Sequence, residues 1–132
     1  MTLEDVIGEW ELEIGGVVGG RAEFAWDLGG AYVLQRQEPF EEGPPKGLMI
    51  IEPAGDGYRQ HYFDSRGVTR VYEMSFDGDT WILLRTKPDF TELSFRQRFV
   101  GEYRGDMIEG RWETGDDDGG WKLDFELVYR RV

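Results

Sequence analysis

The chain has 132 residues, which fits one domain with a single hydrophobic core, and 39% of them are hydrophobic, enough to pack that core. The 27 acidic residues outnumber the 15 basic ones and give a net charge of -12, which repels phosphate backbones and anionic membrane surfaces. We therefore expect no nucleic-acid partner and no membrane partner. Cysteine is absent, which excludes disulfides, thiol nucleophiles and cysteine metal sites and suits a cytoplasmic location.

The first residues contain neither a basic segment nor an apolar one, and no later stretch approaches the ~18 consecutive apolar residues of a membrane span. We expect a protein that is neither secreted nor inserted in a membrane. Because no linker or sequence repeat divides the chain, one domain over residues 1–132 is predicted.

The N-terminal segment carries a helix signal and then changes its pattern. Thr2 is followed three residues later by Asp5, a pairing typical of a helix N-terminus, so residues 2–7 are predicted to form one helical turn at an end of the fold. From Trp10 onward, apolar residues alternate with glutamates at a period of two. This alternation predicts a first strand with one dry and one wet face.

Nine further strands are predicted from the same alternation, and short turns rich in glycine and aspartate separate them. They lie at residues 21–27, 31–39, 48–53, 58–64, 68–76, 80–86, 95–103, 108–114 and 121–130. Most connections are too short for parallel crossovers, so the neighbours are antiparallel. Closing the sheet removes its two exposed edges. The sequence therefore predicts an all-β fold, a ten-stranded antiparallel up-and-down β-barrel with a short N-terminal helical turn.

Two longer connections interrupt the regular spacing, at residues 40–47 and 87–94, and both contain proline. Loops at the mouth of a barrel can be long without disturbing strand pairing, so both are candidates for the border of a binding site. The alternative is that they are plain surface loops.

The two ends of the chain resemble the calycin superfamily of lipocalins, fatty-acid-binding proteins and avidins. The resemblance rests on Gly8-Glu9-Trp10 in the first strand and on Arg130-Arg131 at the end of the last one. In those proteins a tryptophan from such a motif closes the bottom of the barrel, and a late arginine packs across it. The resemblance implies the same arrangement here.

Most of the chain is also similar to a family of small bacterial lipocalin-like proteins. The similarity rests on Tyr129 and on residues 60–68 (QHYFDSRGV), 70–72 (RVY), 88–90 (PDF), 97–99 (QRF), 110–113 (GRWE) and 124–125 (DF). It implies the barrel fold over nearly the whole chain and transfers no activity, because fold does not carry function.

The turn at residues 64–68 allows the inward face of two strands to be assigned. Three loop residues with Gly67 in the left-handed conformation pair Asp64 with Val68. Counting back places Arg59 opposite Glu73, a charge pair that suits the solvent face. The other face then belongs to the lumen and carries Tyr58, Gln60, Tyr62, Arg70, Tyr72 and Met74.

The next turn, read as Asp77-Gly78, places Met74 opposite Trp81 and Arg70 opposite Arg85. Two unpaired arginines inside a barrel would each cost several kcal/mol, roughly, so we expect something anionic beside them, either a buried carboxylate or a ligand. A one-residue change in the turn would instead move Arg85 to the solvent face.

Arg70 and Tyr72 share one face, and fatty-acid-binding proteins use an arginine and a tyrosine to bind a carboxylate. The alternative is that Arg70 is satisfied by backbone carbonyls, or by Glu38 or Asp124. The remaining inward set is expected to be mostly core: Trp10, Leu12, Ile14, Phe24, Trp26, Phe95, Phe99, Trp112, Trp121, Phe125, Leu127 and Tyr129. The candidate ligand-binding residues are Trp26, Tyr58, Gln60, Tyr62, Arg70, Tyr72, Met74, Trp81, Arg85, Phe99 and Trp112.

His61 is the only histidine, and the assigned register turns it outward beside Val71. Nitrobindin-like barrels bind haem through a histidine near the C-terminus, and residues 121–132 contain none. The three aspartates at 116–118 lack the alternating ligands and distal glutamate of an EF-hand. We therefore expect no metal site and no cofactor.

Two hypotheses about function follow. In the first, the lumen binds a small hydrophobic or amphipathic molecule, and Arg70 and neighbouring tyrosines contact its polar or anionic end. In the second, the same lumen is the site of a metal-independent lyase, isomerase or cyclase acting on a small organic substrate, with Tyr62, Tyr72, Arg70 and Asp124 as acid and base candidates. A completely filled barrel would exclude both hypotheses, and a homodimer remains open.

Overall fold

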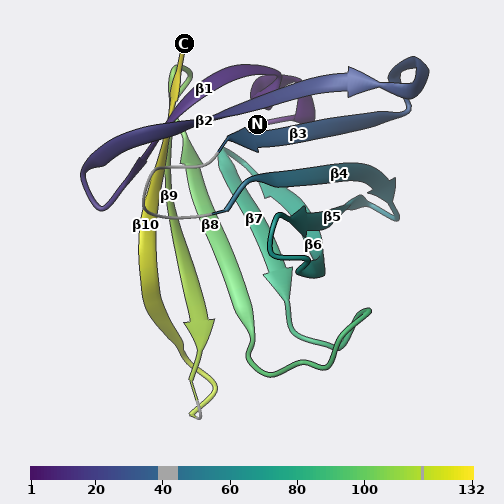
Figure 1. The fold of residues 1–132 in the computed structure, drawn as a ribbon, viewed down its shortest axis with the longest axis vertical. Helices are drawn as coiled ribbons and strands as arrows, with labels where there is room; N and C mark the ends of the chain where they lie inside the picture. Colours follow the sequence, from purple (N-terminus) through teal and green to yellow (C-terminus); the bar gives the residue numbers. More distant parts are fainter. Residues whose placement is uncertain (39–44, 117) are drawn as a thin grey trace.

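The computed structural model describes residues 1–38, 45–116 and 118–132, and within them the chain forms a closed antiparallel barrel of ten strands (Figure 1). Each strand pairs with its neighbours in the chain, and β1 pairs with β10 to close the barrel, as the sequence predicts. The strands are β1 (Gly8–Ile14), β2 (Val17–Asp27), β3 (Tyr32–Glu38), β4 (Gly47–Ala54), β5 (Gly57–Asp64), β6 (Thr69–Asp77), β7 (Thr80–Arg85), β8 (Gln97–Tyr103), β9 (Met107–Gly115) and β10 (Trp121–Arg131).

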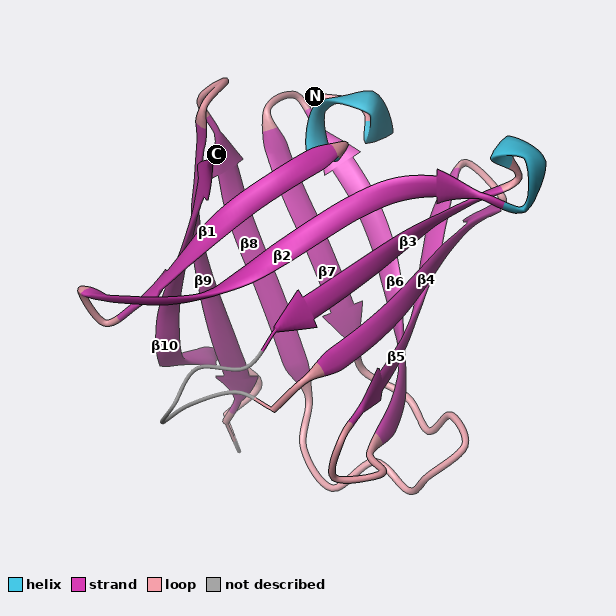
Figure 2. Ribbon diagram, turned by 45° about the horizontal axis from the view of Figure 1, so that its top comes forward, coloured by secondary structure: helices cyan, strands magenta, loops and turns pink. Residues whose placement is uncertain are grey.

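Two short 3-10 turns lie at one end of the barrel (Figure 2). The first, η1 (Leu3–Val6), is the predicted N-terminal turn, and its backbone is capped by the Asp5 carboxylate, which accepts from the Thr2 N–H at 2.7 Å. Its two buried side chains, Leu3 and Val6, join the core. The second, η2 (Leu28–Gly30), was not predicted and precedes β3.

The main boundary difference lies in β2, which begins at Val17 rather than at residue 21. A tight turn at Gly15 and Gly16, both with positive φ, pairs Val17 with Ile14. The sequence pattern misses this extension because Val17 and its neighbour are both exposed, so polarity does not alternate there. The predicted connection at 40–47 lies mostly outside the described residues.

The register between β5 and β6 is confirmed. Arg59 lies opposite Glu73, and His61 lies opposite Val71. Gly67 has a φ of 84°, and the Asp64 N–H donates to the Val68 carbonyl at 3.1 Å. The lumen face assigned to these two strands therefore stands.

The predicted register between β6 and β7 is wrong by two residues. The turn residues are Gly78 and Asp79, so Met74 lies opposite Leu83 and Trp81 lies opposite Phe76. Gly78 has positive φ at the first loop position, where glycine is favoured. Because strand side chains alternate with a period of two, the shift keeps every residue on its predicted face. It does remove the predicted pairing of Arg70 with Arg85.

One half of the barrel lumen, which we call the closed half, is filled by aromatic side chains. Trp81 packs against Phe99 with ring centroids 5.0 Å apart, and Phe24 and Tyr129 lie within 6.0 Å of the same ring. The buried indole N–H of Trp81 has no hydrogen-bond acceptor among the described residues. The bulk of Phe99 fits because Gly110 lies beside it without a side chain. This half of the lumen is a packed core.

Trp10 and Arg131 close this end, as the calycin resemblance implies. Trp10 is fully buried, and the Arg131 guanidinium lies 4.1 Å from the centroid of its ring. The same guanidinium donates to the carbonyls of Asp5 at 2.7 Å and Ile7 at 3.0 Å. It thereby ties β10 to the segment that leads into β1.

Among the described residues, no helix has the length and apolar character needed to span a membrane.

Candidate functional site

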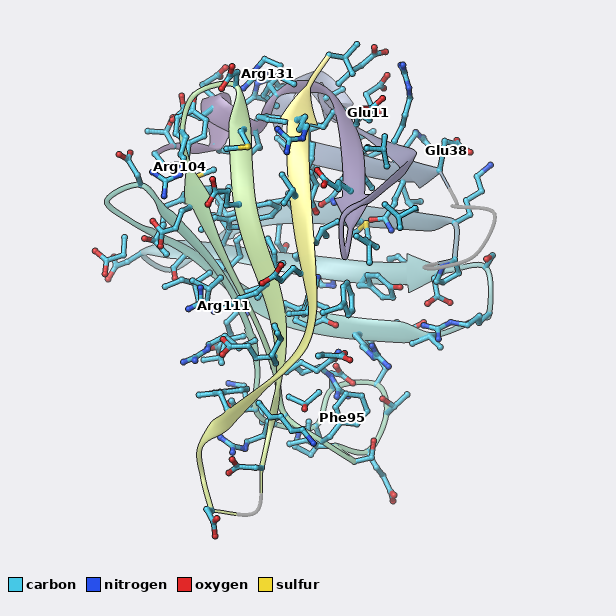
Figure 3. All side chains as sticks on the ribbon, turned by 90° about the vertical axis from the view of Figure 1, so that its left-hand side faces the viewer. Glu11, Glu38, Phe95, Arg104, Arg111 and Arg131 are labelled. Atoms are coloured by element: carbon cyan, nitrogen blue, oxygen red, sulfur yellow. The ribbon has the colours of Figure 1, made fainter. Side chains whose placement is uncertain are left out.

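A cavity of about 500 Å³ occupies the open end of the barrel, opposite the end closed by Trp10. Figure 3 shows Arg131 at the top of the molecule, at the closed end, and Phe95 well below it, toward the open end. The cavity is lined by Ile14, Gln37, Pro45, Tyr62, Arg66, Arg70, Tyr72, Phe95, Gln97, Trp112, Asp124, Phe125 and Leu127. The lumen is therefore filled at one end and hollow at the other.

Arg70 is the cation of this cavity whose charge is not neutralised by a described neighbour. Within residues 1–38, 45–116 and 118–132, no carboxylate lies within 4.0 Å of its guanidinium. The alternative partner Glu38 lies 4.0 Å from Lys46 instead. The guanidinium lies 5.5 Å from the centroid of the Phe95 ring, where it makes a cation–π contact. Its charge therefore remains available to an anion in the cavity.

Tyr72 lies two residues along β6 from Arg70 and is buried. Its hydroxyl donates to the Gln97 Oε1 at 3.0 Å. Burial raises the pKa of Tyr72, although the positive charge of the nearby Arg70 guanidinium acts in the opposite direction. The two groups predicted to share one face thus lie together in the cavity wall.

The other arginine of the cavity, Arg66, is already paired. Its Nε and Nη2 donate to the Asp64 Oδ2 at 3.1 and 2.7 Å, and the Tyr62 hydroxyl donates to the same oxygen at 2.8 Å. Burial acts to raise the pKa of Asp64, but these hydrogen bonds and those from two backbone N–H groups hold it at about 2. Asp64 therefore neutralises Arg66.

Arg85 is buried and inward, as predicted, and it has the anionic partner that its burial requires. The side chain is only 3% exposed, and its Nε donates to the Asp89 Oδ2 at 2.8 Å. This hydrogen bond holds the pKa of Asp89 far below its usual range. The expected partner is therefore a carboxylate of the chain itself, supplied by the loop between β7 and β8.

The remaining predicted site residues separate into three places. Trp112 lines the cavity. Met74, Trp81 and Phe99 belong to the packed core beneath it, and the buried Gln60 donates to the Gln35 Oε1 at 3.0 Å. Trp26 and Tyr58 lie at the opposite end, beside a separate cleft of about 350 Å³ near Leu3. Trp26 is 40% exposed because β2 extends past the closed end of the barrel there.

Several cavity residues were not in the predicted ligand-binding set, chiefly Arg66, Gln97 and Asp124. Gln97 alternates with the buried Phe99 along β8, so strand periodicity could have found it. Asp124 lies at a β-bulge between Leu123 and Phe125, where period-two counting fails.

His61 lies on the outer face, as predicted, and it has a partner there. Its Nε2 is 2.8 Å from the Glu52 Oε1, and Arg59 donates to the same oxygen at 3.1 Å. The hydrogen bond from His61 is the main reason that the pKa of Glu52 is lowered. In the described part of the chain, no three acidic, histidine or cysteine residues are grouped to hold a metal ion.

No protein-family model matches the chain, and no curated protein matches it. The fold and the cavity therefore carry the functional argument alone.

Proposed function

We propose that this chain is a calycin-like binding protein that holds a small amphipathic monoanion in the open half of its barrel. The observation that carries the proposal is Arg70, a half-buried cation in the cavity wall with no described carboxylate within 4.0 Å. A partly desolvated guanidinium without a counter-ion is costly, so a bound anion would stabilise it. The closure of the other end by Trp10 and Arg131 supports the calycin assignment.

The charges of the cavity favour one negative group on the ligand. Arg66 is neutralised by Asp64, and Asp124 also lines the cavity, so a second anionic group would find no free cation among the described lining residues. A planar carboxylate suits the fork of a guanidinium, and the Tyr72 hydroxyl lies beside it. We therefore propose a monocarboxylate rather than a dianion.

The rest of the lining favours an apolar body. Ile14, Trp112, Phe125 and Leu127 line the cavity from β1, β9 and β10, and none of them carries a charge. The volume of about 500 Å³ falls in the range of roughly 300–1,000 Å³ that is typical of small-molecule sites. An aliphatic or aromatic tail fits this composition.

The alternative of a metal-independent lyase, isomerase or cyclase stays a prediction. Burial raises the pKa of both Tyr62 and Tyr72, which moves them away from the neutral range where a general base works best. No specific observation therefore favours catalysis over binding.

The proposal is tested with matched ligands that differ only in the charged group. Decanoate and decan-1-ol are titrated into the wild-type protein, with tryptophan fluorescence and the melting temperature as readouts. We expect decanoate to raise the melting temperature and to bind roughly 10-fold or more tightly than the alcohol, because a hydrogen bond to a charged group contributes about 1.5–3 kcal/mol. Equal affinities, or no binding of either ligand, would contradict the proposal.

Trp112→Phe provides the control for the location of the signal. Trp112 lines the cavity, whereas Trp10 and Trp81 are buried in the packed half. We expect this variant to bind decanoate with a much smaller change of fluorescence. An unchanged signal would place the ligand elsewhere.

A further inference from the structure

The wall of the barrel has an interruption beside Arg70. Pairing between β6 and β7 runs from Asp77 and Thr80 to Glu73 and Leu84, and β7 ends at the next residue, Arg85. The first four residues of β6, residues 69–72, therefore extend beyond its ladder with β7. Residues 86–96, which we call the strap, connect β7 to β8 across this gap (Figure 2).

A second cavity, of about 660 Å³, lies between the strap and the end of the β5–β6 hairpin. Phe63, Val68 and Thr69 line it from the hairpin, and Phe90 lines it from the strap. Arg70 and Phe95 line both this cavity and the lumen cavity. The Arg70–Phe95 contact is therefore the boundary between the gap and the binding site.

One carboxylate anchors the strap to the barrel. The Asp89 side chain accepts five hydrogen bonds: from the Val71 N–H at 2.9 Å, from Arg85 Nε and Nη2 at 2.8 and 3.2 Å, and from the N–H and hydroxyl of Thr91 at 3.1 and 3.2 Å. The bond to Val71 occupies a β6 donor that a strand partner would otherwise satisfy. Asp89 thus supplies the hydrogen-bond acceptor that a neighbouring strand would otherwise supply to Val71.

At its far end the strap is held by Arg96, which donates to the carbonyls of Asp116 and Gly120, and near its start an exposed ion pair joins Lys87 to Glu73. Between these points the strap packs loosely around Asp89. Phe90, next to the anchor, is 72% exposed. A third hollow, of about 360 Å³, separates the strap from the outer face of β5 and β6 near His61. Segments with few buried apolar contacts open locally at low free energy, so the part of the strap beside β6 is held mainly through the buried Arg85–Asp89 ion pair.

We propose that the ligand reaches the lumen sideways, through the gap between β6 and the strap, and that the Arg85–Asp89 ion pair is the latch of this passage. This inference rests on the proposed binding function. It adds the path by which the ligand enters the lumen and the ion pair that limits the rate of entry. The latch lies outside the lumen lining, so its release changes the height of the barrier and leaves the bound state unchanged. Association and dissociation should then accelerate together.

The test is stopped-flow fluorescence of decanoate binding to wild type, Asp89→Asn and Glu92→Gln. Both substitutions remove one negative charge from the strap, but Glu92 is exposed. We expect Asp89→Asn to raise the association and dissociation rate constants about 10-fold each, with the Kd within about twofold, because it loses charge-assisted hydrogen bonds. Glu92 lines the passage but does not belong to the latch, so Glu92→Gln should at most speed association of the anion modestly and should leave the dissociation rate constant at the wild-type value. Unchanged rates in Asp89→Asn, or a change confined to the Kd, would overturn the latch.

Amide hydrogen exchange at Val71 gives a readout that needs no ligand. Its N–H is bonded to Asp89 and not to a strand. We expect Val71 to exchange faster in Asp89→Asn and unchanged in Glu92→Gln. Failure of decanoate to bind the wild type would overturn the binding function and the passage with it, whereas unchanged exchange at Val71 with normal binding would overturn the latch alone.

Thr91→Val serves if Asp89→Asn does not fold. The Thr91 hydroxyl donates to Asp89 and accepts from Arg85, and valine keeps its shape. We expect a smaller acceleration of both rate constants, about two- to fivefold, since one neutral hydroxyl is lost. Rates equal to those of wild type in this variant would count against the latch.

Discussion

The two ends of the barrel each carry an arginine at an inward position, and the two arginines have opposite surroundings. Arg131, at the closed end, donates to the carbonyls of Asp5 and Ile7 and lies over the Trp10 ring. Arg70, at the open end, contacts the Phe95 ring and borders two cavities. The arginine is structural at the closed end, where its donors are bonded within the chain, and it is a binding candidate at the open end, where no described residue is hydrogen-bonded to them.

The surroundings follow from the side chains that fill each end. Trp10, Phe24, Trp81, Phe99 and Tyr129 occupy the closed half so completely that a water-filled site has no room there. In the open half, polar inward residues such as Gln97 lie among the aromatic ones, and a cavity remains. The stability of the fold should therefore depend on the closed end, and ligand binding on the open end.

The largest effect is expected from Trp10→Ala. Trp10 is fully buried and also supports Arg131, so its truncation should lower the free energy of unfolding by about 3–5 kcal/mol. Trp112→Ala, the matched change in the half-buried cavity wall, should cost only about 1–2 kcal/mol. Urea unfolding measures both. Equal losses would contradict the division into a structural and a binding end.

Asp64 is the point where the open end contributes to stability, and its contribution depends on pH. Its folded-state pKa of about 2 lies below its ordinary value of 3.8. The stabilisation is therefore fully present above about pH 4 and is lost as the pH falls toward 2. We expect Asp64→Asn to lose on the order of 2 kcal/mol at neutral pH and to show a shallower decline of stability below pH 4.

Asp56→Asn is the control for this titration, because Asp56 lies in the exposed turn between β4 and β5. It should keep the full acid-induced decline of the wild type. A decline in Asp64→Asn as steep as that of Asp56→Asn would show that other carboxylates carry the effect.

The smallest effect is a difference between two matched arginine variants. Arg131→Met loses hydrogen bonds to the carbonyls of Asp5, Ile7 and Gly105 and a cation–π contact, and we expect it to cost about 1–2 kcal/mol. Arg70→Met loses only its contact with Phe95 and should change stability by less than about 0.5 kcal/mol. The free energies of unfolding test this order, and a larger loss in Arg70→Met would reveal a structural role for Arg70.

Much of the fold could be predicted because local patterns and turn residues decide it. Gly67 fixed the hairpin register of β5 and β6, and period-two alternation placed Arg85 inside. The register of β6 and β7 could not be predicted with the same security, because Asp77-Gly78-Asp79 supports two different two-residue turns.

The site was predicted less completely than the fold. Asp89 lies in an irregular loop, where no periodicity indicates that a side chain folds back onto β6. Trp26 follows the inward alternation of Phe24 but lies beyond the end of the barrel wall. Alternation gives the face of a residue, whereas its depth along the lumen depends on strand tilt and on the volumes of its neighbours.

The most direct test of the account compares decanoate and decan-1-ol binding in wild type, Arg70→Met and Arg131→Met. Wild type and Arg131→Met should prefer decanoate by roughly 10-fold or more, and Arg70→Met should bind both ligands with similar affinity, because among the described residues of the lining Arg70 alone has no paired carboxylate. A preference for decanoate that survives in Arg70→Met would contradict the central claim.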